Sequence, residues 1–271
     1  MVDVDVPPIY SRLPEPLIGA MREIARTKRL LVALDFDGTL APEVDEPEQA
    51  RATPEAREAV LRLLKMPNTR VALVSGRAIG SLEKVADLPD SALLVGSHGI
   101  ELRLDTPDIR INLNTAELDR VDVLGDLLGE VADKLDQVWI ESKPAGFALH
   151  TRLATEADSR MAHLVALRET SAEFDDLTVR AGKNVLEFSV RSTTKGEAIE
   201  HLREYTAATA VFFAGDDVTD EDAFAALDAD DLGLKSGDGS TLANYRVRGP
   251  REIASALALL ADLREGDVHE Q

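Results

Sequence analysis

Residues 30–40 read LLVALDFDGTL, an almost continuous apolar run that ends in acidic and small residues. A run of this kind predicts a strand that is buried on both faces of a parallel sheet. Asp35 and Asp37 then fall at the carboxyl end of that strand, where open α/β sheets bind their ligands. Gly38 allows the backbone to turn sharply just after them. This stretch therefore predicts both the type of fold and the place of a site.

Strands and helices alternate on both sides of this stretch. A short helix is expected over 17–28, and Thr53 is expected to cap a helix that has Pro54 at its first position. Further buried strands are expected at 70–74, 93–95, 210–214 and 232–234, and a terminal helix from about residue 251. This order predicts an α/β fold with a doubly wound, Rossmann-like parallel sheet.

The pattern changes between residues 104 and 190. Helices expected over 116–135 and 156–171 are mixed with short strands that have polar interruptions, and residues 143–146 (KPAG) have the composition of a turn. This mixture predicts an α+β insert rather than more parallel sheet. We therefore expect a discontinuous core domain, 1–103 with 191–271, and a second domain over 104–190.

Composition restricts the partners. The chain has 271 residues and no cysteine, and its 50 acidic and 30 basic side chains give a formal net charge of -20. So negative a surface repels nucleic acid and anionic lipid, and without cysteine neither disulfides nor a thiol nucleophile can form. No apolar run approaches the ~20 residues needed to cross a bilayer. We expect a cytoplasmic monomer that acts on a small molecule.

Asp35 and Asp37 form the first candidate site. Two carboxylates so close together are stable as anions only with a cation or a proton between them, and a divalent metal would supply that cation. Unequal environments would let one carboxyl group attack while the other shuttles protons. The alternative is a pair of aspartates that merely form a turn at the end of a strand.

Two smaller groups follow buried strands or open helices. Ser75, with the backbone amides of Gly76 and Arg77, could bind a phosphate, although a plain turn into a helix would look the same. Lys195 opens the helix after the insert and could neutralise crowded oxygens, although a lone lysine is usually a solvated surface charge.

Residues 216–222 contain five acidic side chains in seven positions, directly after an apolar strand. Such crowding is electrostatically costly unless a hard cation lies nearby. The alternative is a highly charged helix start, because acidic residues favour the first turn of a helix. That alternative explains Glu221 and Asp222 well but Asp216 poorly.

Four segments together resemble the motifs of the haloacid-dehalogenase-like phosphotransferase superfamily, in the same order along the chain: LDFDGTL (34–40), VSGR (74–77), TTKG (193–196) and GDDVTDED (215–222). The resemblance implies that Asp35 is the nucleophile and that Asp37 is the general acid and base. It implies Mg²⁺ held by Asp35, the backbone carbonyl of Asp37, and Asp216. It leaves the roles of Asp217 and Asp220 open.

The same resemblance implies phosphate binding by Thr39, Ser75, Gly76 and Lys195, with Lys195 also acting in catalysis. Other segments resemble the trehalose-6-phosphate phosphatases within that superfamily: GSHGIE (96–101), ESK (141–143), HTR (150–152), VLEF (185–188), DVTDEDAF (217–224) and LKSG (234–237). In that family an inserted cap selects the substrate, which here would be residues 104–190.

The family resemblance implies that Glu141, Lys143 and Glu187 hold the glucose hydroxyl groups and that Arg77 and His98 line the core side of the site. Without the resemblance, Glu141 and Lys143 could be one solvated strand face, and Glu187 could simply alternate into water between Leu186 and Phe188. His98 could satisfy a loop carbonyl. Trp139 reads either as a sugar platform or as part of the core of the insert.

The implied activity is Mg²⁺-dependent hydrolysis of the phosphate monoester trehalose 6-phosphate through an aspartyl-phosphate, the final step of trehalose biosynthesis. Without a synthase domain, we expect a stand-alone phosphatase. The alternatives are related phosphatases for sucrose phosphate, mannosyl-phosphoglycerate or glucosyl-glycerol phosphate, a phosphotransferase or mutase, and a non-catalytic sugar-phosphate sensor. Two departures from the family pattern bear on the sugar: no proline precedes Lys195, and Asp238 replaces a neutral residue.

Overall fold

The computed structural model describes residues 13–44, 46–182 and 184–269. The chain forms two compact units. The core unit consists of Met1–Arg110 and Thr194–Gln271, and the inserted unit is the single segment Ile111–Thr193. The inserted unit therefore interrupts the sequence of the core unit, which consists of two separate segments.

The core unit is built on a sheet with the strand order β12-β11-β10-β1-β2-β3-β4-β5. From β12 to β3 every neighbouring pair is parallel, and β4 runs antiparallel to β3. The strands are β1 (Leu30–Leu34), β2 (Thr69–Val74), β3 (Leu93–Gly96), β4 (Glu101–Arg103), β5 (Arg110–Ile111), β10 (Ala210–Gly215), β11 (Leu232–Ser236) and β12 (Tyr245–Val247). The predicted parallel core sheet is confirmed.

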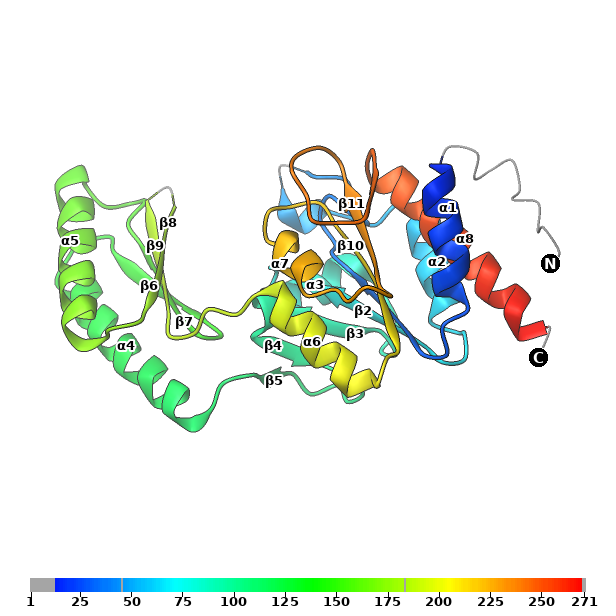
Figure 1. Ribbon diagram of the computed structural model, residues 1–271. Coiled ribbons are helices and arrows are strands. Elements are labelled where there is room, and N and C mark those ends of the chain that lie inside the picture. Colours follow the sequence, from blue (N-terminus) through cyan, green and yellow to red (C-terminus); the bar gives the residue numbers. More distant parts are fainter. Residues whose placement is uncertain (1–12, 45, 183, 270–271) are drawn as a thin grey trace. The chain divides into compact units, whose positions relative to one another are not determined.

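Helices cover both faces of this sheet. One face packs against α1 (Glu15–Ala25), α2 (Pro54–Leu63), α3 (Ile79–Ala86) and α8 (Pro250–His269), of which α1, α2 and α8 lie together in Figure 1. The other face packs against α6 (Lys195–Thr206) and α7 (Asp220–Ala225). Strand β1 contributes to the hydrophobic core on both faces of the sheet. Val32 packs on the face covered by α1, α2, α3 and α8, and Leu31 packs on the face covered by α6 and α7. This burial on both faces accounts for its continuous apolar sequence.

The loop after β1 is fixed by local hydrogen bonds. The amides of Leu40 and Ala41 both donate to the carbonyl oxygen of Phe36 at 2.9 Å, which closes a tight turn. A 3-10 turn (Pro47–Gln49) leads to α2, where the Thr53 hydroxyl accepts a hydrogen bond from the Ala56 amide at 3.3 Å. The predicted helix start at Thr53 is thus confirmed.

The inserted unit has an antiparallel sheet with the order β6-β7-β9-β8, and α4 and α5 pack on one of its faces (Figure 1). Its elements are α4 (Thr115–Asp133), β6 (Trp139–Lys143), β7 (Gly146–His150), α5 (Glu156–Glu173), β8 (Thr178–Gly182) and β9 (Val185–Ser189). Leu149, Leu186 and Phe188 bury one sheet face against Leu124 and Leu128 of α4. The predicted α+β character of the insert is confirmed.

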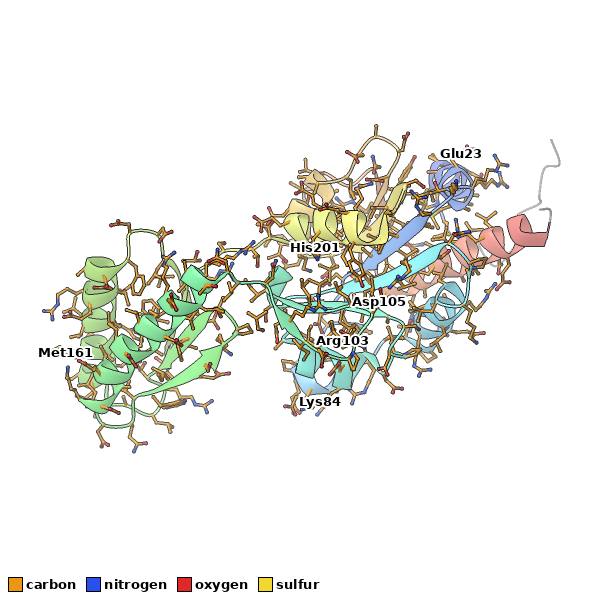
Figure 2. All side chains as sticks on the ribbon, turned by 90° about the horizontal axis from the view of Figure 1, so that it is seen from below. Glu23, Lys84, Arg103, Asp105, Met161 and His201 are labelled. Atoms are coloured by element: carbon orange, nitrogen blue, oxygen red, sulfur yellow. The ribbon has the colours of Figure 1, made fainter. Side chains whose placement is uncertain are left out.

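The unit boundaries fall at 110/111 and 193/194, whereas the sequence pattern placed them at 103/104 and 190/191. Leu104 is buried with the core cluster, and Asp105 accepts hydrogen bonds from Arg70 of β2 and Tyr205 of α6. Figure 2 shows Arg103 and Asp105 together on the core unit. These contacts hold the chain on the core unit beyond β4. The role of the inserted unit as a cap stays a prediction.

Within the three described ranges, none of the helices combines the length and the apolar composition that a membrane crossing requires.

Candidate active site

Asp35 follows β1 directly and is held by the sheet. Its amide donates to the carbonyl oxygen of Ala214 in β10 at 2.9 Å, which continues the parallel ladder by one residue. Its side chain lies at the carboxyl end of the strand and is 7% exposed. Asp35 therefore sits where the sequence placed the nucleophile, in surroundings that strongly disfavour an unpaired charge.

Lys195 supplies a counter-charge to Asp35. It is the first residue of α6, and the hydroxyl of Thr194 caps that helix by accepting from the Glu197 amide. The Lys195 Nζ atom lies 2.6 Å from Asp35 Oδ1 and 2.6 Å from Asp220 Oδ1. Burial disfavours its ammonium group, but the two carboxylates outweigh burial and raise the pKa of Lys195 to about 12. Lys195 is thus a buried cation rather than a solvated one.

Asp216 meets the same cluster from the end of β10. Its Oδ1 atom accepts from the Thr39 hydroxyl at 3.3 Å, and its carboxylate lies over Gly38, which has a positive φ of 71°. Burial, with the nearby charge of Asp220, raises the pKa of Asp216 to about 6. Burial also raises the pKa of Asp35, to about 8, against the opposing effect of Lys195. Three carboxyl groups here share one ammonium ion.

Asp220 organises this cluster from within. Its Oδ2 atom accepts from the backbone amides of Asp216 and Asp217 at 2.9 Å each, while Oδ1 accepts from Lys195. Its side chain is fully buried. Asp217, by contrast, is exposed, and its Oδ1 atom accepts from the neighbouring Val218 amide at 2.6 Å. The two residues that the sequence left unranked therefore have different roles.

Asp37 is held by Arg77 through two hydrogen bonds, from Nε to Oδ2 at 2.5 Å and from Nη2 to Oδ1 at 2.7 Å. These hydrogen bonds with Asp37 raise the pKa of Arg77 above its usual value. Arg77 also places Nη1 3.3 Å from the Ser81 hydroxyl, and its amide donates to the Ser75 hydroxyl at 3.1 Å. The structure thus joins Arg77 to the predicted general acid, a contact that the sequence did not indicate.

Gly76 and His98 lie against each other. A Cβ atom at position 76 would come within 2.6 Å of His98 Nε2, so a larger residue there would require the imidazole to move. His98 and Ser97 both have positive φ angles, which is uncommon outside glycine. Glu101 fixes this turn by accepting from the Ser97 hydroxyl at 2.7 Å and from the Ile79 amide at 3.2 Å. The loops after β2 and β3 are therefore locked together.

The donor set suits a hard divalent cation. One carboxylate oxygen from each of Asp35, Asp216 and Asp220 lies within 4.8 Å of the others. Carboxylate oxygens are the ligands that Mg²⁺ and similar ions prefer. Because both oxygens of Asp220 already accept hydrogen bonds, Asp35 and Asp216 have the greater capacity for a metal. The carboxylate of the third predicted ligand, Asp37, is turned to Arg77, which leaves its backbone carbonyl for the predicted role.

The inserted unit gathers three other predicted residues on the sheet face opposite its helices. Glu141 and Glu187 both pair with Ala148 of the middle strand β7, so they lie in one row across the sheet. Lys143 follows two residues after Glu141 and points to the same side. Its Nζ atom donates to Glu141 Oε1 at 2.7 Å, and this bond, with one from His150, lowers the pKa of Glu141.

Sequence reasoning missed several supporting residues. Lys235 is buried in β11 and donates to the backbone carbonyl oxygens of Asp216 and Asp217, while the Ser236 hydroxyl donates to the carbonyl oxygen of Gly38 at 2.8 Å. A lysine in an otherwise apolar strand was the available signal. Glu101, an acid in the buried strand β4, offered the same kind of signal.

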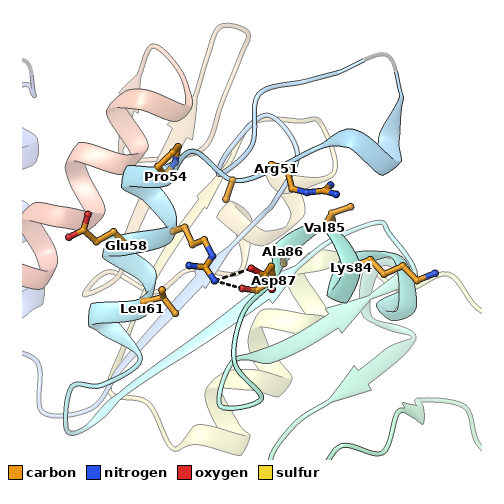
Figure 3. A pocket seen from close by; sticks show the side chains of 10 residues that line it. Arg51, Pro54, Glu58, Leu61, Lys84, Val85, Ala86 and Asp87 are labelled. Carbon is orange, nitrogen blue, oxygen red and sulfur yellow. Dashed lines mark hydrogen bonds and ion pairs between the residues drawn. The ribbon is translucent and has the colours of Figure 1, made fainter.

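A pocket of about 560 Å³ lies elsewhere, between α2 and α3 (Figure 3). Arg57 crosses it to donate to the backbone and side-chain oxygens of Asp87 at 3.0 Å. Arg51, Glu58 and Lys84 also line it, so its charges are mixed. None of its lining residues belongs to the predicted site.

A family model and a curated relative indicate the same family. A model of the trehalose-phosphatase family matches residues 33–246. The trehalose-phosphate phosphatase of Mycobacterium ulcerans is 32% identical over 266 residues, which cover 93% of this chain and 66% of that protein. This chain therefore spans about two thirds of that relative's length.

Solved structures share the fold. The trehalose-6-phosphate phosphatase of Aspergillus fumigatus matches with a TM-score of 0.65 at 24% identity, covering 90% of this chain and 97% of that one. A trehalose-6-phosphate phosphatase related protein matches with a TM-score of 0.62 at 26% identity, covering 89% of this chain and all of that one (100%). The expected combination of a helix-flanked parallel sheet and a separate antiparallel sheet is confirmed.

Proposed function

Because this chain belongs to the trehalose-phosphatase family, we propose that it hydrolyses trehalose 6-phosphate to trehalose and phosphate. The observation that carries the proposal is the buried cluster of Asp35, Lys195 and Asp216 at the carboxyl end of β1 and β10. A carboxyl group in such a place is a candidate nucleophile, because its side chain is shielded from water and held in one position by Lys195. The reaction class follows from this cluster and the sugar from the family.

In the first step, an oxygen of Asp35 attacks phosphorus and the bond from phosphorus to the sugar oxygen breaks. Asp35 then carries an acyl phosphate, and the leaving sugar oxygen takes a proton from Asp37. Arg77 holds the Asp37 side chain in place through both of its oxygens, and it must release the oxygen that carries the proton before this transfer. Lys195 stays beside Asp35 and offsets the negative charge that gathers around phosphorus.

In the second step, water attacks the phosphorus of the acyl phosphate and gives up its proton to Asp37. The bond between phosphorus and the Asp35 oxygen breaks, which releases inorganic phosphate and restores both carboxyl groups. Dividing hydrolysis into two displacements is ordinary covalent catalysis. Asp37 ends each cycle protonated again, with a proton from water in place of the one that left with the sugar.

We further propose that the resident cation is Mg²⁺, held by Asp35, Asp216 and the backbone carbonyl of Asp37. When bound, it supplies a positive charge for the phosphoryl oxygens and allows the two carboxylates to be ionised together. Thr39, Ser75 and the Gly76 amide are proposed to bind the phosphoryl group. The bond from Thr39 to Asp216, and the place of Ser75 after β2, the parallel neighbour of β1, support this role.

Sugar recognition is proposed for Glu141, Lys143 and Glu187 of the inserted unit, and for His98 and Arg77 of the core unit. Hydroxyl groups both donate and accept, so a carboxylate beside an ammonium group matches them well. Lys143 uses one N–H bond on Glu141 and has two others to donate. This supports a sugar rather than an apolar leaving group.

The test is phosphate release from trehalose 6-phosphate, glucose 6-phosphate and sucrose 6-phosphate, measured with Mg²⁺ and with a chelator, for the wild type and Asp35→Asn. We expect release from trehalose 6-phosphate alone, and its loss on chelation and in the variant. Comparable release from all three sugars would reject the substrate and keep the chemistry. Activity that survives in Asp35→Asn would reject the nucleophile.

A further inference from the structure

The carboxylate of Glu141 is held at both of its oxygens. Oε1 accepts from Lys143 Nζ at 2.7 Å, and Oε2 lies 2.8 Å from His150 Nε2. A carboxylate can only accept, so the His150 Nε2–H donates in this contact. Glu141 itself is about half exposed (49%), whereas the His150 side chain is 21% exposed. The more buried histidine therefore fixes an open carboxylate.

His150 is in turn fixed by Trp139. The two residues are directly opposite each other on the antiparallel strands β6 and β7. Their rings stack with centroids 5.1 Å apart and an interplanar angle of 12°. The Arg152 guanidinium lies over the Trp139 ring, 5.3 Å from its centroid. Stacking and register together restrict the imidazole to one orientation.

The strand geometry explains why this contact reaches Glu141. Glu141 pairs with Ala148, so His150 is its diagonal neighbour on the same sheet face. Ala148 is too small to interpose a side chain between them. Trp139, Glu141 and Lys143 alternate along β6, and all three face away from α4 and α5. The exposed part of the Glu141 carboxylate is therefore available to accept a hydrogen bond from a ligand.

We infer that His150 and Trp139 are positioning residues for substrate recognition: Trp139 orients His150, and His150 holds the Glu141 carboxylate in the orientation that accepts a sugar hydroxyl group. The inference rests on the proposed function, in which Glu141 binds the sugar. A carboxylate that is fixed before binding loses less conformational freedom when the sugar arrives. Since neither residue acts on phosphorus, the effect falls on substrate affinity and not on the chemical step.

Two substitutions at position 150 separate the hydrogen bond from the stacking. His150→Phe keeps a ring on Trp139 and removes the donor, whereas His150→Gln keeps an N–H donor and removes the ring. His163→Phe is the matched control, because it makes the same chemical change in α5, where His163 contacts Thr151 and not Glu141. Steady-state hydrolysis of trehalose 6-phosphate is measured for all three, with the thermal midpoint of each to establish folding.

We expect His150→Phe to raise KM about tenfold with kcat within about twofold, since a hydrogen bond to a charged group is lost. His150→Gln should restore KM to within about threefold of the wild type, and His163→Phe should leave it unchanged. Trp139→Leu should raise KM by about threefold. These outcomes support the inference.

An unchanged KM in His150→Phe, or equal losses in the Phe and Gln variants, would overturn the inference and leave the proposed function intact. So would a fall in kcat at constant KM. If the wild-type protein does not hydrolyse trehalose 6-phosphate, the proposed function is rejected before any variant is compared. The positioning role, which depends on that function, is then rejected too.

Discussion

Gly38 lies so close to Asp216 that a Cβ atom at position 38 would be 1.9 Å from the Asp216 Oδ2 atom. The φ angle of Gly38 is 71°, a region that side chains disfavour. Two separate constraints thus require glycine here, one from the backbone and one from the carboxylate above it. The glycine of the turn is part of how the acidic cluster is built.

Gly38→Ala is therefore expected to displace Asp216 and lower kcat/KM at least about 100-fold, with a stability loss of about 1–2 kcal/mol from the positive φ. The matched control is Gly80→Ala in α3, where an added Cβ atom meets nothing within 4 Å. Helix propensity predicts that this control gains up to about 1 kcal/mol and keeps its activity. Urea denaturation and steady-state rates test both. Equal activities in the two variants would contradict the packing argument.

Lys195→Met is expected to destabilise the protein by about 3–5 kcal/mol at pH 8, because it leaves Asp35 and Asp220 buried without their counter-charge. At pH 5 the loss should be smaller, because the raised pKa of Asp35, about 8, keeps its carboxyl group protonated there, whereas at pH 8 part of the wild-type protein holds the ionised carboxylate that Lys195 stabilises. Urea denaturation in the presence of a chelator, at both pH values, measures this. Lys84→Met, at an exposed position, should change stability by less than about 0.5 kcal/mol. A loss that is equal at the two pH values would exclude the charge as its cause.

The pH dependence of divalent-ion binding follows from the raised pKa values of Asp35, about 8, and Asp216, about 6. A metal must displace these protons, so we expect the apparent Mg²⁺ affinity to rise as the pH increases from 5 to 8. Calorimetry in buffers with different ionisation enthalpies would detect the released protons. Proton release that is absent at pH 6 would contradict the prediction.

Stability without metal should have the opposite trend. A folded-state pKa of about 8 for Asp35 exceeds its ordinary value of 3.8, so the folded protein binds more protons than the unfolded chain between these values. The contribution of this group to the free energy of unfolding is fully present below about pH 4 and is lost as the pH rises towards 8. Asp35→Asn should abolish this part of the slope in urea denaturation.

Asp220→Asn and Asp217→Asn are expected to differ sharply. The first replaces a buried acceptor of three hydrogen bonds and removes a charge from Lys195, so kcat should fall about 100-fold or more and Mg²⁺ binding should weaken. The second changes an exposed side chain, and its kcat should stay within about threefold of the wild type. Magnesium titration and kinetics of both variants provide the measurement. Similar behaviour would mean that burial does not separate their roles.

The core of the fold was predictable because its signals are local. Residues 30–40 predicted both a buried strand and the acidic pair after it, and Thr53 with Pro54 predicted the start of α2. The carboxyl ends of parallel strands meet at one sheet edge, so the positions of Asp35, Ser75 and Asp216 followed from the topology.

Other features depend on contacts between distant segments, which periodicity does not report. The pairing of Arg77 with Asp37 and the support of the Asp216 loop by Lys235 join different strands. The unit boundary after β4 was placed too early because Leu104 and Asp105 bind to core residues far away in the chain. The stacking of Trp139 on His150 likewise depends on strand register, so the sequence left the role of Trp139 open.

The pairing of β1 with β10 also has a consequence for how the chain matures. Lys195 and Asp35 are 160 residues apart, and the inserted unit separates β4 from β10 in the sequence. During synthesis from the N-terminus, the continuous inserted unit leaves the ribosome before α6 and β10 emerge. Until those elements emerge, the face of β1 that carries Leu31 and Ala33 has no covering layer. The core unit can therefore complete its central sheet only after the inserted unit has had time to fold.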